Sequence, residues 1–144
     1  MLPGDITTIA IVPFGNNSLE ADMETLISSS LYEEFSKTKR LKIVPEEEAH
    51  AVLSGVITSM TNKAASFSST DVATDYRLTI TLDVTFKRKG EDRVIWKGKG
   101  LSEIMDYKAD AGDVDATEIN RTEAKQELAA EVAELIYDRI FEGF

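Results

Sequence analysis

A segment of strictly alternating residues, 76–86, constrains the fold more than any other part of the chain. Its apolar side chains share one parity: Tyr76, Leu78, Ile80, Leu82, Val84 and Phe86. The other parity, from residue 75 onward, carries Asp75, Arg77, Thr79, Thr81, Asp83 and Thr85. A period of two over this length indicates a β-strand with one buried and one polar face. The sequence therefore predicts a sheet with an uncovered, threonine-rich face.

The segments around this strand predict a mixed sheet. Residues 89–92 form a turn and residues 93–105 a return strand, in which Gly98 and Gly100 indicate a bulge or bend. Earlier strands are expected at 6–14, 41–44 and 51–60, with Gly55 as a bulge or a point of close approach. A helix between the first two strands predicts a crossover that joins parallel strands.

Two amphipathic helices complete the predicted architecture. We expect Asn17 to cap the first, with Glu20 as its capping-box partner, and Asp115 or Thr117 to cap the last, which Gly143 ends. The apolar stripe of the first helix comprises Leu19, Met23, Leu26, Ile27, Leu31 and Phe35, and that of the last comprises Leu128, Val132, Leu135, Ile136 and Ile140. The prediction is one domain, residues 1–144: an α/β (α+β) two-layer sandwich with both helices on one face of a mixed four- to five-stranded sheet.

Charge and composition argue against several functions. The chain has 16 Lys and Arg against 26 Asp and Glu, a net charge of −10, which disfavours nucleic acid as a partner. It has no Cys and one His, His50, so we expect no metal, no cofactor and no catalytic residue, and His50 reads as structural. The acidic residues between Asp110 and Glu118 do not have calcium-loop spacing. The loop "PFGNNS" has one glycine and no lysine, which favours a connector over a phosphate cradle.

Two basic clusters interrupt this acidic chain. One surrounds the predicted hairpin: Lys87, Arg88, Lys89, Arg93, Lys97 and Lys99. The second follows the first helix: Lys37, Lys39, Arg40 and Lys42. Flexible cations can hold phosphorylated or carboxylated ligands, but lysines on a hairpin also prevent edge-to-edge aggregation. The residues alone leave both interpretations open.

Four segments together resemble a known family, the LptE-type LPS-assembly lipoproteins. They are "LPGDITTIAIVPFGNNS", "LYEEFSKTKRLKIVPEEEAHAVLSGVITS", "YRLTITLDVTFKRKGEDRVIWKGKG" and "AAEVAELIYDRIFEGF". The first half alone is also similar to the N-terminal module of TolB-like periplasmic proteins. The long alternating hairpin and the closing helix favour the lipoprotein family.

The resemblance implies a non-enzymatic protein of the Gram-negative outer membrane. Such proteins are lipid-anchored on the periplasmic face through an N-terminal Cys, plug the barrel protein LptD and bind LPS. This chain has no lipobox, no Cys and no signal-peptide pattern in "MLPGDITT". We therefore expect either that the anchor was removed with a leader or that this is not an anchored member of the family.

Under the resemblance, the clusters acquire expected roles. The six hairpin cations become candidate LPS ligands, and the cluster at Lys37–Lys42 a secondary patch. The polar parity from Asp75 to Thr85 becomes a candidate barrel-facing surface, because barrel interiors are polar. The alternative is a TolB-like periplasmic module that binds a protein and no lipid.

Overall fold

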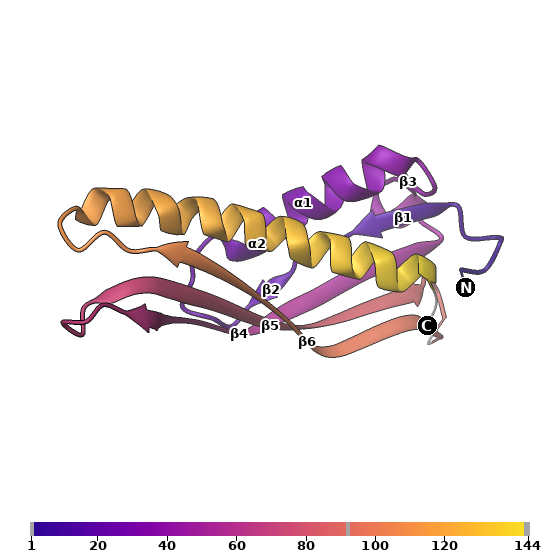
Figure 1. Ribbon diagram of the computed structural model, residues 1–144. Coiled ribbons are helices and arrows are strands. Elements are labelled where there is room, and N and C mark those ends of the chain that lie inside the picture. The colour runs from indigo at the N-terminus through magenta and orange to yellow at the C-terminus, as the bar shows by residue number, and fades with distance from the viewer. Residues whose placement is uncertain (1, 92, 143–144) are drawn as a thin grey trace.

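The computed structural model describes residues 2–91 and 93–142 and shows two helices lying over one face of a mixed sheet (Figure 1). The elements are β1 (Thr8–Ile11), β2 (Gly15–Asn16), α1 (Met23–Thr38), β3 (Lys42–Ile43), the 3-10 helix η1 (Glu46–Glu48), β4 (Ala51–Phe67), β5 (Ala73–Arg88), β6 (Val94–Lys108) and α2 (Val114–Glu142). The predicted two-layer α+β class is confirmed. The sheet of the described chain has six strands rather than four or five, because the two-residue β2 is too short to leave a sequence pattern.

Parallel and antiparallel strands divide the sheet into two parts. The strand order is β3-β1-β4-β5-β6, and β2 pairs with β4 off this path. Strand β1 is parallel to both β3 and β4, so the predicted crossover through α1 is confirmed. Strands β4, β5 and β6 form an antiparallel meander whose long strands make up most of the sheet.

Strand β5 has the predicted alternation. Leu78, Ile80, Leu82, Val84 and Phe86 are fully buried, and the intervening residues are half-buried or exposed. The neighbouring strand β4 continues to Phe67, beyond its predicted end at residue 60. Residues 61–67 lack alternation because they are mostly exposed on both faces. Their backbone pairs with β5 nonetheless, and backbone pairing leaves no side-chain pattern.

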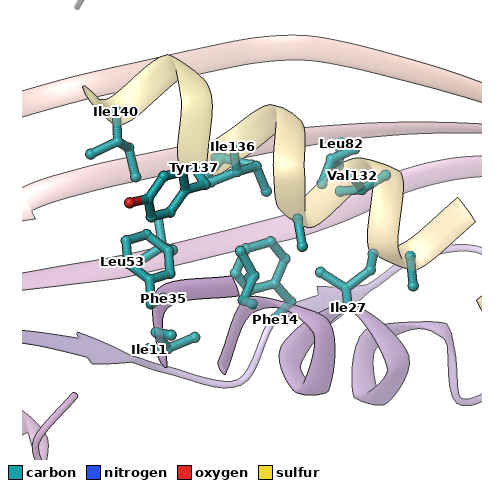
Figure 2. Packing of buried hydrophobic residues seen from close by; sticks show 14 of the residues in the cluster. Ile11, Phe14, Ile27, Phe35, Leu53, Leu82, Val132, Ile136, Tyr137 and Ile140 are labelled. Atoms are coloured by element: carbon teal, nitrogen blue, oxygen red, sulfur yellow. The ribbon is translucent and has the colours of Figure 1, made fainter. Parts of the chain in front are cut away.

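The core forms where the helices meet the sheet and each other. Met23, Ile27, Leu31 and Phe35 of α1 are fully buried, as the predicted stripe requires. The Phe35 ring packs edge-on against Tyr137 of α2, with 5.1 Å between ring centroids, and the Tyr137 hydroxyl hydrogen-bonds the Thr38 hydroxyl at 2.6 Å (Figure 2). These contacts fix α1 beside the second half of α2.

The predicted start of the first helix is wrong. Helix α1 begins at Met23 after Asp22, which has a φ of 68° and makes no side-chain cap. Leu19 lies in the preceding loop and is fully exposed, so it is not part of the apolar stripe. Asn17 is not the cap, because the loop is organised instead by Asn16, whose side-chain oxygen accepts from the Ser18 N–H at 2.8 Å.

The predicted caps of the last helix are also wrong. Helix α2 begins at Val114, before either predicted cap, and the Ala116 N–H donates to the Asp113 carboxylate at 3.0 Å. Thr117 instead accepts from the Asp110 N–H at 2.8 Å. The proposed terminator, Gly143, lies outside the described residues.

Two glycines have the predicted special roles. At Gly55, an added Cβ would lie 2.6 Å from the Phe14 ring and 2.7 Å from the Asp83 carbonyl oxygen, so the strand approaches its neighbours too closely for any side chain. At Gly100, φ is 66° within a register shift of β6, which confirms the predicted bulge.

The first prediction concerns the joint between the helices. Substituting Phe35→Ala should lower the free energy of unfolding by about 3–5 kcal/mol, because a fully buried ring between two helices leaves a cavity. Urea denaturation followed by circular dichroism measures this change. The matched substitution Leu19→Ala should be nearly neutral, since that side chain is fully exposed. Equal losses in both variants would contradict the packing described.

Candidate functional site

The side of the sheet opposite the helices is covered by no described element and is rich in hydroxyl groups (Figure 1). Strand registers place its side chains in rows across β4, β5 and β6. Two such rows are Ser59–Thr81–Ser102 and Thr61–Thr79–Ile104. We call this surface the open face. The predicted polar parity of β5 therefore lies on it, from Asp75 to Thr85.

One end of the open face carries two ion pairs between β5 and β6. The Arg77 guanidinium donates to both carboxylate oxygens of Asp106, at 2.8 and 3.1 Å, and Lys108 lies 2.8 Å from Asp75. Hydrogen bonds from Arg77 lower the pKa of Asp106, and the hydrogen bond from Lys108 lowers the pKa of Asp75. Asp75 and Arg77 are thus neutralised within the sheet.

Asp83 has a structural partner at the middle of the face. Its carboxylate accepts a hydrogen bond from the Gly100 N–H at 2.8 Å, which holds the bulge of β6 in place. Thr79, Thr81 and Thr85 have no such bond through their side chains to described residues. On this face of β5, the threonine hydroxyls can therefore bind a partner, whereas the charged side chains make contacts that stabilise the sheet.

At the other end of the open face, the β5–β6 hairpin borders a hollow of about 420 Å³. Its lining residues are Glu46, Val52, Ser54, Thr85, Lys87, Arg88, Lys89, Gly90 and Glu91. Val52 and Thr85 lie on the open face itself, because they pair with Lys87 and Lys97 respectively. The hollow thus joins the hydroxyl surface to the predicted basic cluster.

Two of the six hairpin cations fasten the N-terminal part of the chain. The Arg88 guanidinium donates to Asp5 at 2.6 and 3.1 Å, which raises the pKa of Arg88 and lowers that of Asp5. The Lys89 ammonium donates to the Glu46 carbonyl oxygen at 2.5 Å, and the backbone N–H of Lys89 donates to the His50 carbonyl oxygen at 2.9 Å. Arg88 thus holds the hairpin against the start of the chain, and Lys89 holds it against the segment between β3 and β4.

Of the other four hairpin cations, Lys87 lines the hollow, whereas Arg93, Lys97 and Lys99 are not among its lining residues. Lys97 pairs with Thr85 and lies on the open face, and Lys99 lies within the bulge. Arg93, Lys97 and Lys99 are exposed and form no ion pair with residues 2–91 or 93–142. Lys87 also lies on this side of the sheet, beside Val52. The structure therefore separates the predicted set into Arg88 and Lys89, which clamp, and four cations that face solvent or the open face.

The secondary patch lies where α1 ends and β3 begins. Lys37 pairs with Glu34 at 3.2 Å, and the Arg40 guanidinium lies 4.0 Å from the centre of the Phe141 ring. Lys39 and Lys42 line a shallow hollow of about 410 Å³ with Phe35 at its base. Half of this patch is therefore occupied by contacts within the protein.

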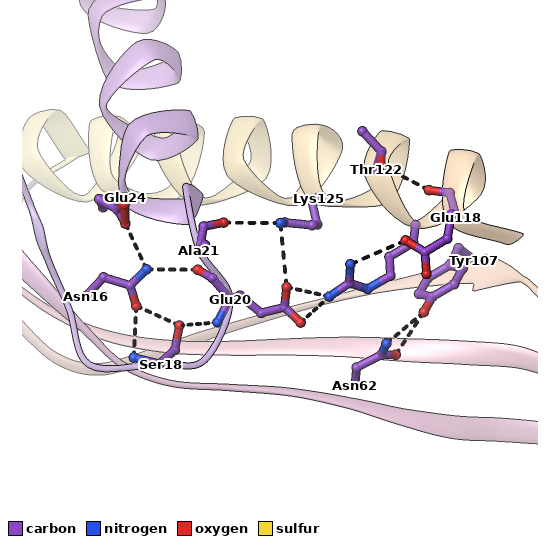
Figure 3. Close-up of polar contacts among 11 residues, drawn as sticks. Asn16, Ser18, Glu20, Ala21, Glu24, Asn62, Tyr107, Glu118, Thr122 and Lys125 are labelled. Carbon is purple, nitrogen blue, oxygen red and sulfur yellow. Dashed lines mark hydrogen bonds and ion pairs between the residues drawn. The ribbon is translucent and has the colours of Figure 1, made fainter. Parts of the chain in front are cut away.

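One ionic cluster was not predicted (Figure 3). Glu20, in the loop before α1, pairs with Arg121 of α2, and Lys125 lies 3.5 Å from the same carboxylate. Burial lowers the pKa of Arg121, but the hydrogen bonds and charge of Glu20 outweigh this effect and the net shift is upward. About a hundred residues separate the partners, so no local pattern indicates them. Glu20 is thus a tether rather than a capping-box residue.

The remaining candidates have structural roles or form no site. The His50 ring nitrogen Nδ1 accepts from the Thr7 N–H at 3.1 Å, and Trp96 is buried in the core. No group of three or more His, Cys, Asp or Glu side chains in the described chain could hold a metal ion. Neither described helix is long and apolar enough to cross a membrane.

Solved structures share this fold. Rare lipoprotein B from Shewanella oneidensis is 17% identical, with a TM-score of 0.59 over 87% of this chain and 90% of that one. A minor lipoprotein from Acinetobacter baumannii is 12% identical, with a TM-score of 0.58 over 94% and 91%. The hypothetical protein CT253 from Chlamydia trachomatis is 9% identical, with a TM-score of 0.60 over 96% and 99%. At these identities the similarity establishes the fold alone.

The sequence itself establishes the family. The model of the LptE lipopolysaccharide-assembly family matches residues 6–140, nearly the whole chain. The protein belongs to this family, and the resemblance read from its residues is confirmed. Family membership indicates an LPS-assembly lipoprotein. No curated protein sequence matches the chain significantly.

The second prediction concerns the ion pairs of the open face. In an NMR titration of the carboxyl groups, Arg77→Gln should raise the pKa of Asp106 toward its ordinary value of 3.8, while Asp75 keeps its lowered pKa. Because folding favours the ionised form, the stabilisation by each pair is present above the unfolded pKa. It is lost as the pH falls through the lowered folded value. An unchanged Asp106 titration would contradict the pairing.

Proposed function

We propose that this domain is a non-enzymatic plug of an LptD-like outer-membrane barrel, and that it binds LPS through the cations around the hairpin hollow. The observation that carries this proposal is the open face: hydroxyl rows on an uncovered sheet surface, continuous with exposed cations at one end. A plug needs a polar wall, and an LPS ligand site needs cations at the surface.

The hydroxyl rows suit contact with the inside of a barrel. Barrel interiors are polar, and small hydroxyl side chains can exchange hydrogen bonds with such a wall without a large desolvation penalty. The charges at the far end of the face, Asp75 and Arg77, are already paired within the sheet. Lys63 of β4, which lies opposite Arg77 and forms no ion pair with the described residues, adds a positive charge to that part of the surface.

The hairpin cations suit the phosphate groups of lipid A and the LPS core. Flexible ammonium and guanidinium groups form charge-assisted hydrogen bonds with phosphate. Lys87 lines the hollow, Lys97 lies beside it opposite Thr85, and Arg93 and Lys99 are exposed elsewhere on the hairpin. The Arg88–Asp5 pair holds the hairpin to the N-terminal segment. Two cations thus provide rigidity, and four provide the ligand surface.

The contact between Arg88 and the N-terminal segment also suggests where a membrane anchor would lie relative to this surface. We propose that the native protein is lipid-anchored through its N-terminus on the periplasmic face of the outer membrane. The Asp5–Arg88 pair fastens the N-terminal segment to the hairpin, and both lie at the same end of the molecule (Figure 1). An anchor there would hold the hairpin cations near the membrane, where LPS is inserted.

The third prediction tests LPS binding. Labelled LPS should bind the isolated domain, more weakly as salt rises, because exposed ion pairs are screened. Replacing Lys87, Arg93, Lys97 and Lys99 with Gln should weaken binding about tenfold or more, since several charge-assisted contacts are lost. Arg88 and Lys89 stay unchanged, so the contacts that hold the hairpin to Asp5 and Glu46 remain.

A charge-matched variant provides the control. Replacing Lys37, Lys39, Arg40 and Lys42 with Gln removes the same charge from the secondary patch, and LPS binding should change little. Loss of binding only in this control would move the ligand site to the secondary patch. No LPS binding by the unaltered domain would instead favour the alternative, a TolB-like module that binds protein through the open face.

A further inference from the structure

Half of β4 has an unpaired edge. Strands β1 and β2 pair with β4 only up to Ile57, and the Asn17 N–H makes the last hydrogen bond, to the Ile57 carbonyl at 2.9 Å. From Thr58 to Phe67, β4 pairs with β5 on one side, and no strand of the described chain pairs with its other side. The backbone groups along that side point away from the sheet with no strand to receive them.

This edge lacks the charges that protect the opposite edge of the same sheet. Strand β6, the other boundary, carries five charged residues along its length. Residues 51–70 carry one charged residue that is ionised at pH 7, Lys63, and no proline. Between its own register shifts, β4 has a regular segment, residues 59–64. Natural proteins normally guard such an edge with charges or proline, and this one is left open.

We infer that the free edge of β4 pairs with the same edge of a second copy of this chain, in antiparallel orientation about a two-fold axis. An isologous contact of this kind needs a self-complementary surface, and a neutral regular strand edge is one. The chain carries a net charge of −10, so two copies repel over most of their surface. The edge of β4 is a place where they can approach without opposing acidic groups.

The side-chain alternation selects the register. Even-numbered residues of this segment share the helix side of the sheet and odd-numbered residues the open face, because Met60 pairs with Ile80 and Thr61 with Thr79. Directly opposed residues of the two copies must lie on the same face of the sheet. The two-fold axis therefore passes between one residue and the same residue of the second copy. With Asn62 opposite Asn62 of the second copy, Thr61 faces Lys63 of that copy and Met60 faces Ala64. No two like charges are directly opposed.

Exposed apolar side chains lie at both ends of the edge. Phe67 is 60% exposed at the end of β4, and Leu19 is fully exposed, two residues beyond the Asn17 bond to β4. In the antiparallel pair, the end of one strand runs toward the loop of residues 17–20 of the other copy. Each Phe67 therefore approaches the region that carries Leu19, so the ends as well as the middle are complementary.

Pairing in the plane of the sheet keeps both surfaces used in the proposed function exposed, and it concerns the domain outside a barrel. A two-fold axis perpendicular to the sheet keeps both helix layers on one side and both open faces on the other. The hydroxyl rows and the hairpin cations of each copy stay exposed. The inference therefore does not rest on LPS or barrel binding.

The fourth prediction tests this dimer by sedimentation equilibrium of the isolated domain over a range of concentrations. We expect a weak, concentration-dependent dimer, as suits a small interface. Thr61→Lys places a lysine opposite Lys63 of the other copy twice and should raise the dissociation constant about tenfold. Thr61→Glu creates two opposite-charge pairs and should lower it. If general repulsion between acidic chains governed association, Thr61→Lys would lower the dissociation constant and Thr61→Glu would raise it. The two variants therefore distinguish edge pairing from general charge repulsion.

A control at the other edge completes the design. Ser102→Lys adds the same charge to β6 and should leave the dissociation constant unchanged, while circular dichroism checks that each variant is folded. Slower hydrogen exchange of the amides of residues 60–64 at high concentration would support the assigned edge. A monomer at every concentration up to about 1 mM would overturn the inference, as would a dimer that responds to Ser102→Lys and not to the Thr61 variants.

Discussion

Burial of one face of the β4–β5–β6 meander under two helices is the constraint on which the rest of this structure depends. The even-numbered residues of β5 from Leu78 to Phe86 are fully buried, and α1 and α2 meet above them through Phe35 and Tyr137. With the apolar groups on one side, the opposite side of the same strands carries the hydroxyls and charges. The candidate functional surface is therefore the other side of the core.

Ionic contacts between residues distant in the sequence hold the two ends of this two-layer fold together. Arg88 and Asp5 fasten the hairpin to the N-terminal segment, and Glu20 fastens the loop before α1 to Arg121 of α2. Exposed pairs contribute little to overall stability, but pairs that join distant segments fix geometry. Arg88 therefore supports the fold, whereas Arg93, Lys97 and Lys99 form no ion pair within the described part of the chain.

The sequence predicts those features that follow from local periodicity. The alternation of β5, the stripe from Met23 to Phe35 and the bulge at Gly100 all appear in the structure, because burial and backbone angle impose a regular spacing. The family follows from the order and spacing of segments along the chain, and the match over residues 6–140 confirms it.

The features that local patterns cannot reveal depend on contacts between distant residues. The separation of the hairpin cations into clamp and ligand surface required knowing where Asp5 and Glu46 lie. The extent of β4 required its pairing with β5, since backbone hydrogen bonds carry no side-chain signature. Asn17 and Glu20 have the composition of a capping box, but in the structure Asn16 holds the loop and Arg121 of α2 binds Glu20.

The central claim is that the open face, and not the helical side, meets the partner. The chain contains no Cys, so a single thiol can report on each side: Thr79→Cys on the open face and Thr25→Cys on the outer surface of α1. The measurement is the rate of labelling of each thiol in the free domain and in its complex with an LptD-like barrel. The account predicts that the complex protects the thiol at position 79 and leaves position 25 reactive. Protection at 25 with free labelling at 79 would contradict it.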